Sequence, residues 1–108
     1  MVINSEEVEI KNIEILTEEE REVTKKILSD YLKKIKRLVK DSPKIKAHIK
    51  EYNKEGKQKK FSINIDLHFS GRRLKSDAAD WDLAKTLHKC MIKIQNEIEH
   101  IFHTSDKR

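Results

Sequence analysis

The sequence predicts an α+β fold, a two-layer sandwich in the order β-α-β-β-β-α. Two segments repeat apolar residues with the period of a helix, and four shorter segments alternate apolar and polar residues as half-buried strands do. The alternation predicts a mainly antiparallel, four-stranded sheet with one face in water, so both helices are expected on the other face. A chain of 108 residues forms one domain around a single core.

The N-terminal part begins with a polar segment, residues 1–7, which we expect to be flexible. Val8–Lys11 alternates apolar and charged residues, which predicts the first strand, and a break is expected at Asn12. The single domain is expected to span residues 8–103 and to be followed by a C-terminal tail, residues 104–108.

A long helix is predicted from Thr17 to Lys40. Thr17 and Glu20 have the spacing of a capping box, in which each side chain accepts a hydrogen bond from the other residue's backbone N–H. The helix is expected to end before Pro43, which cannot continue it. Its apolar side consists of Val23, Ile27, Leu28, Tyr31, Leu32, Ile35, Leu38 and Val39.

Three alternating strands are predicted after this helix. Residues 44–52 and 61–70 form the first two, and a hairpin loop at residues 53–57 joins them. Ser70-Gly71 is expected to turn the chain into a last strand at residues 73–78.

The second helix is predicted to start near Asp80. Asp77, Asp80 and Asp82 are interpreted as caps of this helix, which is simpler than a Mg²⁺ site. Trp81 is interpreted as a packing residue, with a base or sugar contact as the alternative. The core face of the helix reads Leu83, Leu87, Met91, Ile94, Ile98 and Ile101.

The net charge of +5 is unevenly distributed. Residues 1–22 contain eight acids against Lys11 and Arg21, so this part carries −6 and the remainder carries +11. A charge magnitude of about 2–8 already keeps a small domain soluble. The basic remainder therefore favours a polyanionic partner, and nucleic acid is the commonest one.

Both helices are predicted to carry cations on their outer faces. In the second helix, Lys85, Lys89 and Lys93 lie one turn apart. The alternative is that these lysines only keep the protein soluble, but the strands carry further cations at residues 44–50 and 73–75. In the first helix, the cations opposite the apolar side are Lys25, Lys26, Lys33, Lys36, Arg37 and Lys40.

The sequence favours recognition of folded RNA through its backbone and shape. The outward side of the central strand offers Ser62, Asn64, Asp66 and His68, with Tyr52 as the ring nearby. Readers of single-stranded RNA stack bases on exposed aromatic side chains, so stacking is not expected here.

Several functional classes are not expected. With one cysteine, Cys90, no internal disulfide forms, which fits a reducing cytoplasm, and the thiol is expected to be small and buried. Only His100 and His103 have a helical ligand spacing, so no metal is expected. With two glycines, no phosphate-binding loop exists, and we expect neither a cofactor nor enzymatic activity. No apolar run approaches the roughly 18 residues of a membrane span.

Three stretches, Val8–Val23, Lys33–Arg37 and Leu74–Ala84, together resemble the ribosome hibernation promoting factor family, also called protein Y or ribosome-associated inhibitor A. They correspond to the opening strand with its threonine-capped acidic helix start, the end of the long helix, and the acidic turn into the last helix. The similarity spans roughly residues 8–102. The chain departs from the family at Trp81–Leu83, where Met-Tyr or Leu-Tyr is usual.

The resemblance implies a short-form factor, monomeric when free, that binds ribosomal RNA of the small subunit in the decoding channel. It implies occlusion of the messenger and transfer RNA positions, with no small-molecule substrate and no membrane. The implied contacts to ribosomal RNA are Lys25, Lys26, Lys33, Lys36, Arg37, Lys40, Arg72, Arg73, Lys75, Lys85, Lys89 and Lys93.

Two alternatives remain open. The first is a double-stranded-RNA binding module, which normally has a Lys-Lys-x-Ala-Lys-like start to its last helix. Asp82–Lys85 lacks that cationic pair. The second is a protein-interaction domain whose lysines only solubilise it, which predicts no retention of RNA.

Overall fold

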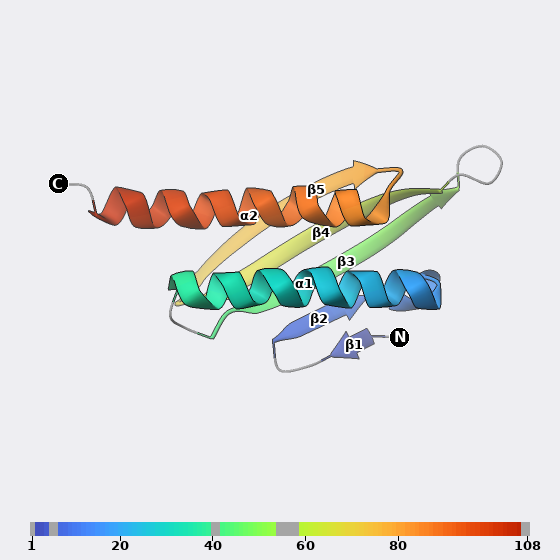
Figure 1. Ribbon diagram of the computed structural model, residues 1–108, viewed down its shortest axis with the longest axis horizontal. Helices are drawn as coiled ribbons and strands as arrows, with labels where there is room; N and C mark the ends of the chain where they lie inside the picture. The colour runs from blue at the N-terminus through green and yellow to red at the C-terminus, as the bar shows by residue number, and fades with distance from the viewer. Residues whose placement is uncertain (1, 5–6, 40–41, 54–58, 107–108) are drawn as a thin grey trace.

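The structure is a computed structural model that describes residues 2–4, 7–39, 42–53 and 59–106, with side chains described for 7–39, 42–52 and 59–101. Its elements follow in an order that matches the predicted one from Val8 onward (Figure 1). They are β1 (Val2–Asn4), β2 (Val8–Lys11), the 3-10 helix η1 (Ile13–Ile15), α1 (Glu18–Val39), β3 (Lys44–Asn53), β4 (Lys59–Phe69), β5 (Arg72–Asp80) and α2 (Leu83–Asp106).

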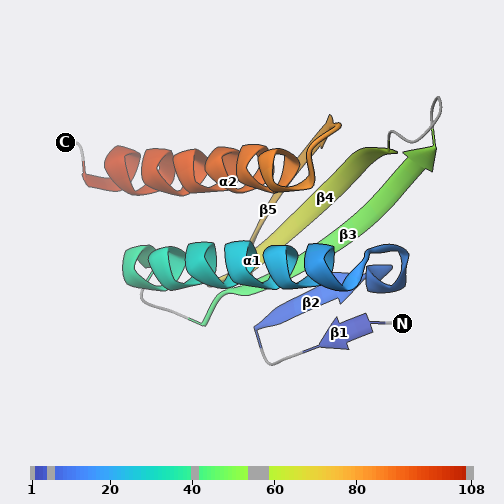
Figure 2. The ribbon, with the colours of Figure 1, turned by 45° about the vertical axis from the view of Figure 1, so that its right-hand side comes forward.

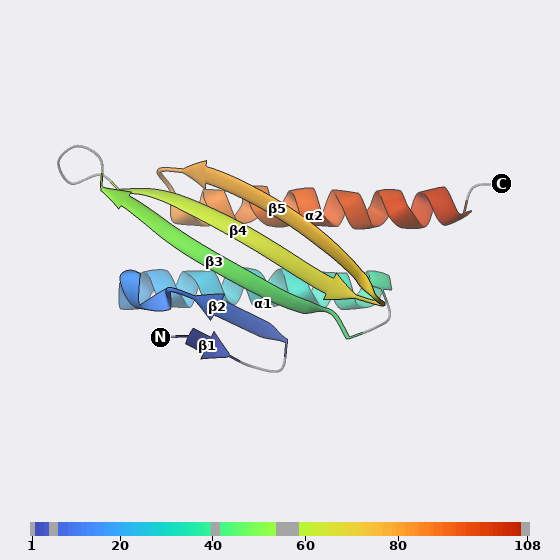
Figure 3. The same cartoon turned by 180° about the vertical axis from the view of Figure 1, so that it is seen from behind.

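The sheet has the order β1-β2-β3-β4-β5. Only β2 and β3 pair in parallel, because α1 connects them as a crossover, and the other neighbours are antiparallel. Helices α1 and α2 lie side by side and run in the same direction over one face (Figures 1 and 2). The opposite face carries no helix (Figure 3). The predicted α+β sandwich is confirmed.

The predicted four strands are β2 to β5, and the short strand β1 adds a fifth at the edge. We expected residues 1–7 to be flexible, yet Val2–Asn4 pairs with β2 and sets Ile3 opposite Ile10. A three-residue strand is too short to show an alternating pattern, which is why the sequence did not reveal it. At the other end, α2 continues to Asp106, past the expected domain limit at residue 103.

The start of α1 is fixed by the predicted capping box. The backbone N–H of Glu20 donates to Thr17 Oγ1 over 3.1 Å, and the N–H of Thr17 donates to Glu20 Oε1 over 2.9 Å. Val23 and Leu38 differ from the prediction, since they are 40% and 37% exposed. Both lie at the margin of the apolar stripe.

The core lies between the helices and the sheet. Strand β4 lies between β3 and β5 and buries every second side chain, from Phe61 to Phe69, under the two helices. The predicted breaks are confirmed, since Asn12, Ser70 and Gly71 have positive φ angles of 66°, 48° and 75°. Of the hairpin loop predicted at residues 53–57, Asn53 is the last residue of β3, and residues 54–57 lie outside the described residues.

The second helix begins at Leu83 rather than near Asp80, because β5 continues to Asp80. Asp82 is the residue that caps it, since its Oδ1 accepts the backbone N–H of Lys85 over 2.9 Å. The predicted core face is buried from Leu83 to Ile98, and Ile101 is half-buried against it.

Candidate nucleic-acid interface

The outer side of α1 exposes most of its predicted cations. Lys25 is half-buried and lies 3.6 Å from Glu22, and Lys26 lies 3.3 Å from Asp30. Lys36 pairs with Glu7, which follows β1 in the chain. Lys40 lies outside the described residues.

Two cations of α1 differ from these. Lys33 and Arg37 are exposed, one helical turn apart, and make no ion pair within the described part of the chain. A phosphate at this position would not have to displace a carboxylate from either side chain. Lys33 and Arg37 are therefore the cations of α1 most available to an anionic partner.

The lysines of α2 are held by the neighbouring strand. Lys89 Nζ donates to Asp80 Oδ2 over 2.8 Å, and Lys85 Nζ lies 3.8 Å from the same oxygen. Lys93 Nζ donates to the backbone carbonyl oxygen of Asp77 over 2.8 Å. These three lysines are predicted site residues, but each already has a partner on the β5 side of the helix.

The sequence suggested that Asp80 caps α2. In the structure Asp80 instead forms ion pairs with Lys85 and Lys89. Its carboxylate also accepts the backbone N–H of Trp81 over 2.6 Å. The hydrogen bond from Lys89, followed by the one from Trp81, lowers the pKa of Asp80 below its ordinary value. Asp77 contributes its carbonyl oxygen, not its side chain, to this arrangement.

The remaining predicted cations lie on β5. Arg73 and Lys75 face away from the helices, opposite His68 and Asp66 of β4. Arg73 Nε lies 3.7 Å from Asp66 Oδ1, whereas Arg72 and Lys75 make no ion pair among the described residues. The predicted cations therefore do not form one surface, because Arg73 and Lys75 lie on the face opposite the helix lysines.

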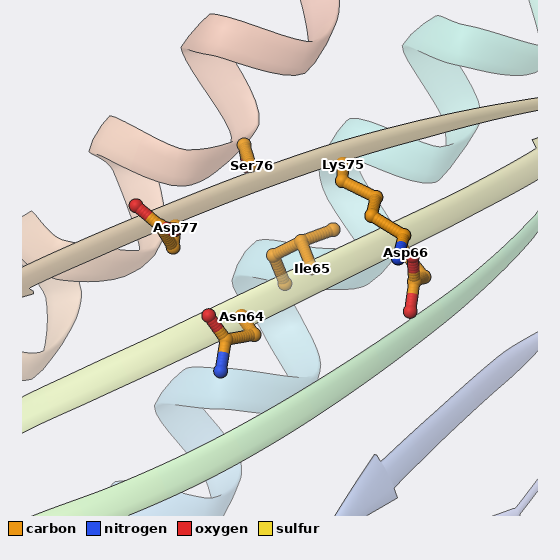
Figure 4. A pocket seen from close by; sticks show the side chains of 6 residues that line it. All are labelled: Asn64, Ile65, Asp66, Lys75, Ser76 and Asp77. Atoms are coloured by element: carbon orange, nitrogen blue, oxygen red, sulfur yellow. The ribbon is translucent and has the colours of Figure 1, made fainter.

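A shallow pocket lies between β4 and β5 on this opposite face. Figure 4 shows Lys75 extending across β4 toward Asp66, with Asn64 and Asp77 beside each other further along the strands. The pocket volume is about 260 Å³. Across the described residues, no group of three or more histidine, cysteine, aspartate or glutamate side chains is placed to hold a metal ion.

The two helices meet through a polar contact that sequence reasoning missed. Tyr31 Oη and His88 Nδ1 are 2.8 Å apart, and their rings meet edge to face with centroids 5.5 Å apart. Lys34 Nζ lies 5.1 Å from the centre of the Tyr31 ring. Together with Val23 and Ile27, these side chains line a groove of about 300 Å³ between the helices. Burial raises the pKa of the Tyr31 phenol.

The face without helices, which we call the open sheet face, is strongly basic. The alternation and register of β2 to β5 place their outward residues there (Figure 3). The sequence indicated strand cations at residues 44–50 and 73–75, but of this face only Arg73 and Lys75 were among the predicted RNA contacts. Six lysines on this face make no ion pair with any described residue, and we call them the open-face lysines: Lys11, Lys44, Lys46, Lys50, Lys60 and Lys75.

Trp81 is not a packing residue. Its side chain is 47% exposed, and Lys60 Nζ lies 5.9 Å from its ring centre. The prediction was wrong because it placed Trp81 in the first turn of an amphipathic helix, where tryptophan usually packs. In the structure Trp81 precedes α2 and follows β5, on the outward side of that strand. Tyr52 is also 47% exposed, on the outward side of β3 as predicted.

The described fold is similar to the solved structure of the Thermus thermophilus Protein Y N-terminal domain, with a TM-score of 0.67 and 15% sequence identity. The similarity covers 92% of this chain and 99% of that domain. No protein-family model and no curated protein sequence matches the chain. At this identity the likeness establishes a shared fold. No helix of the described residues is long and apolar enough to cross a membrane.

Proposed function

We propose that this chain is a non-enzymatic factor that binds the small ribosomal subunit in the decoding channel, in the cytoplasm. There it occludes the positions of messenger and transfer RNA and inhibits translation as a hibernation or stress factor. The observation that carries the proposal is the fold shared with the Protein Y N-terminal domain over nearly the whole of both chains. The family resemblance in the sequence gives the same assignment independently of the structure.

Binding is expected to depend on phosphate neutralisation by the helix cations. Lys33 and Arg37 contribute most, since neither makes an ion pair with a described residue that a phosphate would have to replace. Lys85, Lys89 and Lys93 contribute less for each charge, because contact with RNA must first release Asp80 or the Asp77 carbonyl. The ion pairs of these cations therefore rank their contributions to RNA binding, whereas the sequence alone gives no reason to rank them.

Co-sedimentation of the purified protein with isolated small subunits tests the proposal. Saturable binding near one protein per subunit is expected, and it should exceed binding to a naked RNA duplex. If roughly 6–10 cations contact phosphates, affinity falls by about 10³–10⁵ between 50 and 200 mM salt. Equal binding to subunits and duplex supports the duplex-RNA alternative, and no binding to either at low salt supports a protein-interaction domain.

A pair of charge-reversal variants locates the interface. Lys33→Glu with Arg37→Glu should weaken subunit binding by more than about tenfold and reduce the salt slope by about two. The matched control, Lys44→Glu with Lys46→Glu, makes the same charge change on the open sheet face and should retain subunit binding. Unchanged binding of the first variant would exclude the outer side of α1 as the interface.

A further inference from the structure

Tyr52, Lys60 and Trp81 form a row across one end of the open sheet face. Tyr52 on β3 is in register with Lys60 on β4. Asp80 is the register partner of Phe61, so the next residue of β5's chain, Trp81, comes beside Lys60. The distance of 5.9 Å between Lys60 Nζ and the Trp81 ring centre agrees with this placement. Two rings therefore flank one lysine on the same face.

Both rings are far more exposed than the aromatic side chains of the core. The other described aromatic side chains that belong to the core, Tyr31, Phe61 and Phe69, are 4–7% exposed, against 47% for Tyr52 and Trp81. Two strand spacings of about 4.8 Å separate the two rings by roughly 10 Å. This distance suits neighbouring unstacked bases rather than one molecule sandwiched between the rings.

The charge of the same face fits a phosphate backbone. Among the open-face lysines, Lys60 stands in the row itself and Lys50 is the next outward residue beside Tyr52 on β3. The others lie on β2, β3 and β5, and none of the six has an ion-pair partner among the described residues. Acids at the outward positions are Glu9, Asp66 and Asp77, and Asp66 is already paired with Arg73. Flat rings beside unpaired lysines are the combination by which proteins bind single-stranded nucleic acid.

We propose that the open sheet face binds single-stranded RNA, with successive bases stacked on Trp81 and Tyr52 and phosphates held by the neighbouring lysines. A duplex cannot use this site, because its bases are already stacked on one another. The site lies on the face opposite Lys33 and Arg37, so it is independent of the proposed binding of the small subunit through the helices. The protein would then engage folded RNA with one face and an unpaired strand with the other.

The single tryptophan of the chain makes the site directly observable. Titration with an oligouridylate of about ten nucleotides, within the length range that one such surface covers, should quench Trp81 fluorescence to saturation. An RNA duplex of the same length should not. Tyr52→Ala should weaken binding by about 5- to 150-fold, the usual loss for one stacked base, while Tyr52→Phe should retain it.

Controls separate stacking from charge alone. Ile92→Ala removes a comparably exposed apolar side chain, 48% exposed on α2, and should leave RNA binding unchanged. An abasic oligonucleotide that binds as tightly as oligouridylate would refute base stacking. Equal quenching of Trp81 by polyglutamate would also refute it and would indicate an acidic protein partner. Anisotropy of labelled oligouridylate extends the test to Trp81→Ala, and circular dichroism of each variant verifies the fold.

The test also distinguishes this site from the proposed function. The Lys33→Glu, Arg37→Glu variant should lose small subunits and keep the quenching of Trp81. Tyr52→Ala should show the converse, with subunit co-sedimentation retained. Loss of both activities in either variant would mean that the two faces are not independent and would overturn the assignment to the open sheet face.

Discussion

Cys90 is enclosed between α2 and the sheet, where its Sγ lies 3.5 Å from the carbonyl oxygen of Ile63. Desolvation raises the pKa of its thiol to about 11 from an ordinary value of 9.0. This shift of about two pKa units lowers the fraction of thiolate near neutral pH about 100-fold, and the thiolate is the form that reacts. Cys90 should therefore react with a disulfide reagent at least about 100-fold more slowly in the native protein than in guanidinium chloride. Equal rates would show that the thiol is accessible.

Asp80 predicts a defined dependence of stability on pH. Its pKa is lowered in the folded protein, so its stabilising effect is complete above the unfolded value of about 3.9 and is lost as pH falls through the folded value. Asp80→Asn should therefore be less stable than the unmodified chain at neutral pH, and the difference should vanish in strong acid.

Urea unfolding at several pH values measures this difference. Asp77→Asn is the matched control, because Asp77 contributes a backbone carbonyl rather than its carboxylate to the lysine contacts. A pH-independent deficit in Asp80→Asn would assign the loss to the backbone N–H of Trp81 rather than to charge.

Residue identity predicted some of these environments and not others. The burial of Cys90 follows from its place on an apolar helix face. The exposure of Trp81 does not, because it depends on where β5 ends, and the sequence gives no sharp boundary between Ala78 and Leu83. The partners of Lys85 and Lys89 depend on the same boundary, since a longer β5 brings Asp80 beside them.

At the level of elements, the capping box decides where α1 begins. Thr17→Ala removes the acceptor for the backbone N–H of Glu20, which should cost about 1 kcal/mol of unfolding free energy. Ser29→Ala changes an exposed hydroxyl in the middle of the same helix and should cost little, since alanine favours helices. Chemical denaturation compares the two, and equal losses would contradict a specific role for the cap.

The contact between Tyr31 and His88 joins the two helices near the middle of α1. Tyr31→Phe removes the hydroxyl but keeps the ring, and it should cost about 0.5–1.5 kcal/mol of unfolding free energy. A double-mutant cycle with His88→Ala isolates the pair, and Tyr52→Phe serves as an exposed tyrosine control. A coupling energy near zero would mean that the two side chains stabilise the helices separately.

The elements themselves were largely predictable because their patterns are local. The alternation in β4 is unbroken from Phe61 to Phe69, and the Thr17–Glu20 spacing marks the start of α1. The strand β1 was not predictable, because only its pairing with β2 makes those three residues a strand. Val23 and Leu38 were wrongly predicted to be buried, because the spacing of apolar residues along α1 does not show how much of the helix surface its neighbours cover.

On the scale of the whole molecule, the sequence predicted which cations are exposed but not how they are grouped. Their types and helical spacing indicate a basic surface, whereas their division between two faces follows from strand register. Lys75 illustrates this, because its position opposite Asp66 places it behind the helices rather than among their lysines. Open-face lysines such as Lys11 and Lys60 come from strands far apart in sequence, so no local pattern reveals them.

The parallel pairing of β2 with β3 has a consequence for the order in which the protein is made. Strands β1 and β2 leave the ribosome first, but β2 has no neighbour toward the sheet centre until α1 and then β3 have been synthesised. By contrast, β3, β4, β5 and α2 follow one another and pack on their immediate successors. Until β3 has been synthesised, the nascent chain therefore carries a strand whose inner edge is unpaired, a situation in which strands associate wrongly. The acidic residues on both sides of β2 are placed to keep β2 soluble until β3 pairs with it.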